Sequence, residues 1–237
     1  MTQYDSNPLH AHPLVQTLIK IINVDSHDDF LNLLEDKLVL ASEKVCSSAK
    51  KNSSVKTFNE LCDSARRNIQ DPKELELHLE LLEKKLEDDI SCQIAHMLDE
   101  SGFIAEHDPN HNGHVDILVR SQNKKFKWLG EAKLYGGKKY SEKGLYQLVN
   151  DYSLGNPNES GGVLIYLNST QYNVMEVVTQ WQEYLQQISI DSEARLKNFT
   201  SNYRADYPLI FVSQHDHHKT GIRYKIRHCC LDIRIDF

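Results

Sequence analysis

The spacing of apolar residues changes at Gly102, and this change constrains the fold of the chain more than any other feature. Before Gly102, apolar residues recur every three or four positions, which predicts helices over residues 14–69 and again over residues 71–103. Asp71 and Pro72 fit the cap and first turn of the second segment, which is one long helix or a helix pair, and Gly102 ends it. The part of the chain before Gly102 is therefore expected to be helical.

After Gly102, short runs of branched apolar residues alternate with two further helical segments. Strands are predicted over residues 114–120, 124–135, 161–168, 207–214 and 224–237, and helices over residues 141–154 and 171–188. A short polar turn joins the first two strands into a hairpin, and the nearly continuous apolar run of the third is typical of a buried central strand. This order predicts an α/β fold with a mixed sheet flanked by helices over residues 71–237, and a helical N-terminal appendage over residues 1–70.

Composition argues against several classes of protein. The chain has no run of eighteen or more apolar residues, so a membrane span is not expected, and its first residues lack the basic and apolar parts of a signal peptide. Its five cysteines share no CxxC spacing, so neither a disulfide framework nor structural zinc is expected. A soluble protein of the reducing cytoplasm fits these observations.

Basic residues gather in one part of the chain, although the net charge is −7. Eight of them lie in a single stretch, namely Arg120, Lys124, Lys125, Lys127, Lys133, Lys138, Lys139 and Lys143. A basic surface on an acidic protein can follow a phosphate backbone. A solvated, lysine-rich hairpin explains the same residues without a ligand.

Glu131 and Lys133 lie two residues apart in a predicted strand with apolar neighbours, where charges need an explanation. Alternation along the strand places both on one face, roughly 7 Å apart, while Trp128 and Ala132 face the core. Antiparallel pairing across the predicted turn brings Asp116 near Glu131. Two close carboxylates repel each other unless a proton or a cation lies between them, and Mg²⁺ prefers such oxygen ligands. The alternative is an exposed cross-strand ion pair.

Asp116 in HVDILV and Glu131-Ala132-Lys133 in LGEAKL together resemble the motif of the PD-(D/E)xK phosphodiesterase superfamily, the restriction-endonuclease-like nucleases. The resemblance covers about residues 72–170 and departs from the family pattern at Val115, where proline is usual. It implies that Asp116 and Glu131 bind Mg²⁺, or Mn²⁺ in its place, with the Ala132 carbonyl as a further ligand. It also implies that Lys133 positions the attacking water or stabilises the transition state.

Many members of this family carry a further acid on the helix before the first strand and a glutamine on the helix after the second. Glu87 borders the apolar stripe of the first helix and is the preferred candidate, with Glu83 as the second choice. Gln147 projects away from the core stripe of the later helix and resembles the family's glutamine. Tyr152 lies close to where a companion tyrosine is sometimes found, but the spacing is one residue longer than QxxxY. Ordinary surface charge and an exposed structural glutamine are the alternatives.

The segment GGKKY, residues 136–140, is expected to be a mobile basic loop. It either grips a phosphate backbone, with Tyr135 or Tyr140 stacking on a base, or simply connects two elements. Two groups of histidines fall in predicted turns without metal-site spacing, so exposed loop histidines are expected. These groups are His107, His111 and His114, and His215, His217 and His218, of which His114 is expected to border the cleft beside Asp116.

These features predict a Mg²⁺-dependent phosphodiesterase of endonuclease type with Asp116, Glu131, Lys133, Glu87 and Gln147 in its site. DNA is favoured over RNA because the family mostly cuts DNA, and a role in restriction or phage defence follows from the same family habit. A homodimer and a partner protein bound by residues 1–70 are further expectations. The alternative is a catalytically silent nuclease-fold module that binds nucleic acid or protein.

Overall fold

The computed structural model of the chain describes residues 11–48, 53–109, 113–168, 170–191, 195–204, 207 and 209–234. Four helices come first, as the sequence predicts: α1 (Pro13–Ile22), α2 (His27–Ser48), α3 (Ser53–Asn68) and α4 (Pro72–Glu100). The following elements are β1 (Ile104–His107), β2 (Ile117–Arg120), β3 (Lys127–Leu134), α5 (Lys138–Tyr146), the π-helical turn η3 (Gln147–Tyr152), β4 (Glu159–Leu167), α6 (Val174–Ile188), β5 (Lys197–Tyr203), β6 (Ile210–Asp216) and β7 (Arg223–Asp232).

The seven strands form one mixed sheet in the order β1-β2-β3-β4-β7-β6-β5. β2 and β3 pair antiparallel, which confirms the predicted hairpin, and β3, β4 and β7 run parallel to one another. β4 is the middle strand, and every one of its residues is buried, as its continuous apolar run predicts. The predicted mixed α/β architecture is confirmed at this level.

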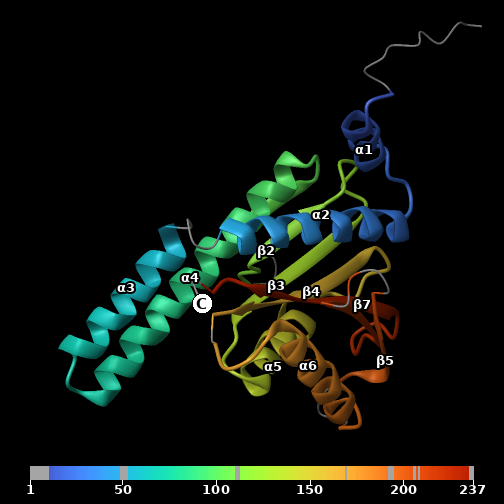
Figure 1. The fold of residues 1–237 in the computed structure, drawn as a ribbon. Coiled ribbons are helices and arrows are strands. Elements are labelled where there is room, and N and C mark those ends of the chain that lie inside the picture. Colours follow the sequence, from blue (N-terminus) through green and yellow to red (C-terminus); the bar gives the residue numbers. More distant parts are fainter. Residues whose placement is uncertain are drawn as a thin grey trace, which may run out of the picture.

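Helices cover both faces of the sheet (Figure 1). On one face α2 and α4 pack against Trp128, Ala132 and Leu164, and on the other α5, η3 and α6 pack against Leu129 and Val163. The alternation predicted for β3 is therefore confirmed, because Trp128 and Ala132 enter one core while the odd-numbered residues face α5. The cleft described below lies at the C-terminal half of β3 and is lined by residues of both α4 and α5.

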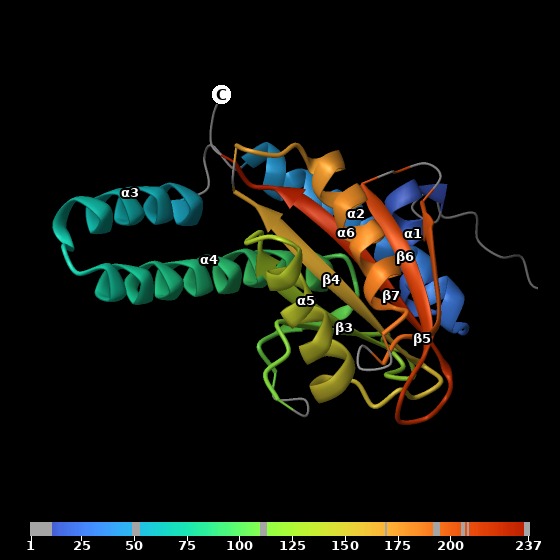
Figure 2. The same cartoon turned by 90° about the horizontal axis from the view of Figure 1, so that it is seen from below.

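α4 is a single helix of 29 residues, which settles the choice between one helix and a helix pair. Asp71 caps it, because its carboxylate accepts hydrogen bonds from the amides of Lys73 and Glu74, both at 2.9 Å. α3 and the first half of α4 extend away from the sheet as a helical hairpin (Figure 2). The second half of α4 packs on the sheet through Leu86, Ile90 and other apolar side chains.

α2 is joined to the sheet by apolar and ionic contacts. Phe30 and Leu34 are fully buried in the core that also holds Trp128 of β3. Glu35 pairs with Arg227 of β7, and its other carboxylate oxygen lies 3.2 Å from Nη1 of Arg204. The division into residues 1–70 and 71–237 stays a prediction, while α2 and the sheet share one core.

Two strands were not predicted, and both lie at the edges of the sheet. β1 has four residues, and β5 has the polar sequence KNFTSNY with most of its side chains exposed. An edge strand pairs on one side only, so it needs little of the apolar alternation by which strands are recognised in a sequence. Among the described residues, no helix combines the length and apolar character that crossing a membrane requires.

Candidate active site

β3 extends beyond its partner β2, and this leaves two of its amides for carboxylates. The antiparallel pairing ends at Gly130, whereas β3 continues to Leu134. Alternate amides of a strand point to the same side, so those of Ala132 and Leu134 face the edge that β2 no longer covers. Asp116 Oδ2 accepts from Ala132 N, and Glu87 Oε1 accepts from Leu134 N, each at 2.6 Å. The end of the strand ladder therefore fixes both carboxylates.

Glu131 and Lys133 form an ion pair on the face of β3 that points toward α5. Lys133 Nζ donates to Glu131 Oε1 at 2.5 Å. Glu131 is only 1 % exposed, so the predicted alternative of an exposed cross-strand pair does not hold. Its second oxygen, Oε2, is buried and has no hydrogen-bond partner among the described residues. A buried acceptor without a partner is costly, and it marks a position where a ligand would be stabilised.

The carboxylates of Glu131, Glu87 and Asp116 lie close together, and their negative charges are only partly balanced by Lys133. Burial, followed by repulsion from Asp116, raises the pKa of Glu131 to about 8. Burial also raises the pKa of Glu87 to about 7, against the hydrogen bond from Leu134, and it raises the pKa of Asp116. Burial alone would lower the pKa of Lys133, but Glu131 and Asp116 raise it by more, so the ammonium stays charged. One lysine therefore faces three acids.

These side chains line a single cleft with a volume of about 710 Å³. All five predicted side chains reach it, as does Glu83, the second choice on α4, and Tyr140, Tyr152, Asp88 and Asp108 complete much of its wall. Glu87 contacts the backbone of β3, whereas Glu83 lies one helical turn farther out. The structure thus brings together the residues that the sequence selected, although the roles given to them remain predictions.

Gly144 of α5, which sequence reasoning missed, allows the helix to approach the charged pair closely. A Cβ at this position would lie 3.0 Å from Cγ of Lys133 and 3.2 Å from Cγ of Glu131. A larger residue would push the helix away from both side chains. The available signal was a glycine inside a helical pattern, which often marks a close approach of backbone.

The π-helical turn η3 explains the unusual spacing between Gln147 and Tyr152. In an α-helix, residues five apart differ by about 140° in direction, so only one could face the cleft. In a π-helix the hydrogen bonds run from i+5 to i, and the amide of Ser153 accordingly donates to the carbonyl of Leu148 at 3.0 Å. Both Gln147 and Tyr152 line the cleft as a result. Burial and then the Glu131 carboxylate raise the pKa of Tyr152 to about 12.

The donor set of the cleft fits a hard divalent cation in its chemistry. Carboxylate oxygens are the ligands that Mg²⁺ and Mn²⁺ accept, and Glu131 Oε2 lies buried without a partner in the described part of the chain. Within the described residues, however, no three His, Cys, Asp or Glu side chains are already arranged as ligands around one point. Asp116 and Glu87 currently bind backbone amides, and Glu131 binds Lys133. A cation would therefore have to draw at least some of these oxygens together.

The basic residues do not form one surface. Lys127 begins β3 and Lys124 and Lys125 come just before it, whereas Lys133 lies six positions after Lys127, which is about 20 Å along the strand. Arg120 pairs with Glu106 at 2.5 Å. The expectation of a mobile loop over residues 136–140 is wrong in part, because α5 begins at Lys138. The exposed side chains of Lys139 and Lys143 lie on this helix, with Lys143 Nζ placed 5.5 Å from the ring centre of Tyr140 at the cleft.

Two of the histidines predicted to be exposed are fully buried. His215 and His217 are both 0 % exposed and pack against the ring of Tyr224. The alternation of β6 turns His215 inward, and His217 opens the turn that follows this strand. His218 is exposed, and His114 borders the cleft as predicted, with its Nδ1 lying 2.9 Å from Asp108 Oδ1. His111 lies outside the described residues.

Replacing Glu131 with Gln should stabilise the metal-free protein progressively as the pH rises from 5 to 8. A carboxyl whose pKa is raised by folding stabilises the folded state fully below its unfolded pKa of 4.5, and this contribution is lost as the pH rises through about 8. Glutamine removes that loss, which is at most about 1.4 kcal/mol for each pH unit between the unfolded and folded pKa values of Glu131. Urea unfolding in EDTA at pH 5 and pH 8 measures the difference. A wild type and a variant with the same pH dependence would contradict the raised pKa.

No protein-family model, no curated protein and no solved structure matches this chain. Its function therefore has to be inferred from the residues and the geometry of the cleft itself.

Proposed function

We propose that this chain is a Mg²⁺-dependent nuclease that hydrolyses phosphodiester bonds in DNA and has a restriction-endonuclease-like fold. The observation that carries the proposal is the buried Glu131 carboxylate, one oxygen of which has no hydrogen-bond partner among the described residues. It lies in a cleft beside Lys133, Asp116 and Glu87. Few buried carboxylate oxygens lack a hydrogen bond in folded proteins, and a cation site is one place where this occurs. Glu159 Oε2 is also buried without a hydrogen bond among the described residues, but Glu159 does not line the cleft. The order of helix α4, strands β1, β2 and β3, helix α5 and strand β4 also agrees with the core of helix, strands, helix and strand that the family resemblance implies.

Asp116 and Glu131 would hold the cation, with Glu87 beside them and the Ala132 carbonyl as a further ligand. A bound Mg²⁺ would supply Lewis-acid stabilisation of the phosphate and lower the pKa of a coordinated water. Lys133 is held at the site by Glu131 and remains charged, so its ammonium can stabilise negative charge that develops on the phosphate oxygens. Gln147 lies in the same cleft and can orient a water or a phosphate oxygen.

α5 provides the surface on which a nucleic acid strand would lie. Lys139 and Lys143 are exposed on this helix, and Tyr140 faces the cleft beside Lys143. Lysines neutralise phosphates without reading sequence, and a tyrosine can stack on a base. DNA rather than RNA, the cytoplasm, a homodimer, a partner bound through residues 1–70 and a role in phage defence follow only from the family resemblance and the composition.

The second candidate is a catalytically silent module that binds nucleic acid or protein. The burial of Glu131 beside Asp116 and Lys133 favours the enzyme over this alternative. Burying an incompletely paired carboxylate is costly, and a binding module has no need of it.

A cleavage assay with several substrates tests the proposal. Supercoiled plasmid, linear duplex, single-stranded circular DNA and RNA are incubated with the protein in Mg²⁺, in Mn²⁺ and in EDTA. Cleavage of DNA that requires a divalent cation supports the proposal, and cleavage of RNA alone would assign the site to the other substrate. Binding in a gel-shift assay without cleavage under any condition would favour the silent module.

A further inference from the structure

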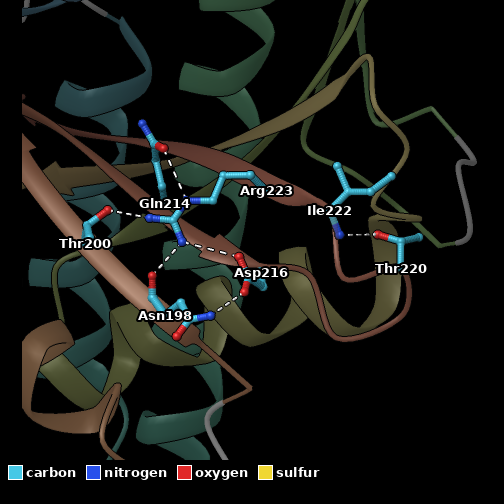
Figure 3. A network of polar contacts seen from close by, with 7 residues as sticks. All are labelled: Asn198, Thr200, Gln214, Asp216, Thr220, Ile222 and Arg223. Atoms are coloured by element: carbon cyan, nitrogen blue, oxygen red, sulfur yellow. Dashed lines mark hydrogen bonds and ion pairs between the residues drawn. The ribbon is translucent and has the colours of Figure 1, made fainter.

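The turn between β6 and β7, residues 217–222, is compact and lies against the end of η3. The amides of Thr220 and Gly221 both donate to the His217 carbonyl, at 3.2 and 2.7 Å, and the His217 amide donates to Ile222 at 2.9 Å. Figure 3 shows this turn, in which Thr220 Oγ1 accepts from the Ile222 amide at 3.3 Å. Its side chains are therefore presented from a preorganised loop rather than from a freely moving one.

Arg223 fixes the base of this turn to the edge of the sheet (Figure 3). Its guanidinium donates to the Asn198 carbonyl and to Thr200 Oγ1 of β5, at 2.5 and 2.7 Å. It also pairs with Asp216 at the end of β6, at 3.4 Å. The turn is thus anchored on three strands at the point where it leaves the sheet.

Lys219 reaches from this turn to the carbonyl end of the π-helical turn. Its Nζ donates to the carbonyls of Asn150 and Ser153, both at 2.9 Å. Carbonyls at a helix end lack intrahelical donors and carry the negative end of the helix dipole, so a lysine there stabilises both. The contact spans 66 to 69 residues of sequence, so it is tertiary and could not be read from local pattern.

His217 is buried and contacts the end of η3 at Ser153. His217 Nδ1 accepts from the Lys219 amide at 3.3 Å, which assigns the proton to Nε2, and Nε2 lies 2.6 Å from Ser153 Oγ. Ser153 Oγ in turn donates to the Val149 carbonyl at 3.1 Å within η3. Burial lowers the pKa of His217 to about 4, so this neutral tautomer persists at physiological pH.

Gly155, which follows η3, packs closely against His217 and Thr220 of the β6–β7 turn. A Cβ at Gly155 would lie 2.4 Å from His217 Nδ1, and Gly155 has a φ of +69°, so only glycine fits there without strain. Thr220 Oγ1 donates to the Gly155 carbonyl at 2.8 Å. Contacts on both sides of Ser153 therefore fix where η3 ends.

We propose that Lys219 and His217 are positioning residues that maintain the π-helical register of η3, so that Gln147 and Tyr152 both face the cleft. A π-turn is less favourable than the α-helical turn that competes with it, and it persists where surrounding contacts impose it. In the α-helical register, Gln147 and Tyr152 would point about 140° apart. The effect on catalysis depends on the proposed nuclease function, whereas the effect on η3 does not.

Lys219→Met tests the proposal by two independent measurements. Hydrogen exchange of the segment 147–153, followed by mass spectrometry, should accelerate by about tenfold or more, while exchange in β4 stays unchanged. In the cleavage assay, kcat should fall about tenfold with KM within about twofold, as for other residues that support a site from behind. Lys219→Arg should restore both, because arginine can donate to the same carbonyls. Lys73→Met, on an exposed part of α4, serves as the matched control.

The outcomes separate the two proposals. Unchanged exchange in Lys219→Met would overturn the positioning role, whatever happens to cleavage. If hydrogen exchange is faster in Lys219→Met but the wild type cleaves no nucleic acid, the positioning role of Lys219 is supported and the nuclease function is rejected. Should Lys219→Met fail to fold, Thr220→Val removes a single hydroxyl donor to Gly155, and it must show the same exchange signature in milder form.

Discussion

Glu131→Gln is expected to abolish metal-dependent cleavage without destabilising the protein. The amide keeps the size of the side chain and an oxygen that can accept from Lys133, but it removes the negative charge that a divalent cation requires. Loss of one preorganised electrostatic group from an active site commonly lowers kcat by roughly 10²–10³-fold, and we expect at least this range. Because burial and the charge of Asp116 raise the pKa of Glu131 and so disfavour its ionised form in the folded state, stability should be unchanged or higher.

The measurement compares single-turnover cleavage and thermal unfolding of the variant with those of the wild type. Glu183→Gln is the matched control, since it makes the same chemical change at an exposed position of α6. Isothermal titration with Mg²⁺ at pH 7.5 should show weakened binding in Glu131→Gln and ordinary binding in the control. Such a combination of lost function and retained stability distinguishes a functional carboxylate from a structural one.

Cleavage at the wild-type rate by Glu131→Gln would reject the site. A large loss of stability in the same variant would instead identify the Glu131–Lys133 pair as structural. The two failures differ in their readout, so neither can be mistaken for the other.

The candidate site could be predicted because each part of it depends on local periodicity. The two-residue repeat of β3 separates Glu131 and Lys133 from Trp128 and Ala132, and the hairpin brings Asp116 to the same edge. Glu87 follows from helix geometry, since it borders the apolar stripe of α4. Periodicity could not reveal why Asp116 and Glu87 lie where they do. β3 extends beyond the end of β2, so two of its amides donate to these carboxylates.

The features that sequence reasoning missed depend on contacts between distant segments. The π-turn at Gln147 and Tyr152 is supported by Lys219 and His217, more than 60 residues farther along the chain. The burial of His215 depends on the register of β6 against β7. The spacing between Gln147 and Tyr152 was a usable signal for the π-helical turn. It is one residue longer than QxxxY, and a π-helical turn accommodates one extra residue.

The second large effect is expected at Glu35, which joins α2 to the sheet. Glu35 and Arg227 are each only 7 % exposed, and Arg227 Nε donates to Glu35 Oε2. Glu35→Leu leaves the guanidinium of Arg227 buried without its carboxylate, which typically costs about 3–5 kcal/mol of the free energy of unfolding. Arg204 also loses a partner, but it keeps its ion pair with Asp36 at 2.7 Å and is more exposed. Urea unfolding at neutral pH measures the loss.

A double-variant cycle shows whether the loss comes from the unpaired charge or from the position itself. Glu35→Leu combined with Arg227→Met replaces the pair by apolar side chains, and it should recover most of the stability, because a buried pair contributes little beyond the cost of its own desolvation. Asp28→Asn breaks the exposed pair between the same helix and strand, Asp28–Lys225, and should cost at most about 1 kcal/mol. If the double variant is as unstable as Glu35→Leu alone, the loss does not come from the unpaired charge of Arg227, and the ion pair itself contributes to docking α2 on the sheet. Recovery of stability in the double variant would instead show that the apolar core around Phe30 and Leu34 holds α2 on the sheet. The ion pair would then fix the register of α2 across β7.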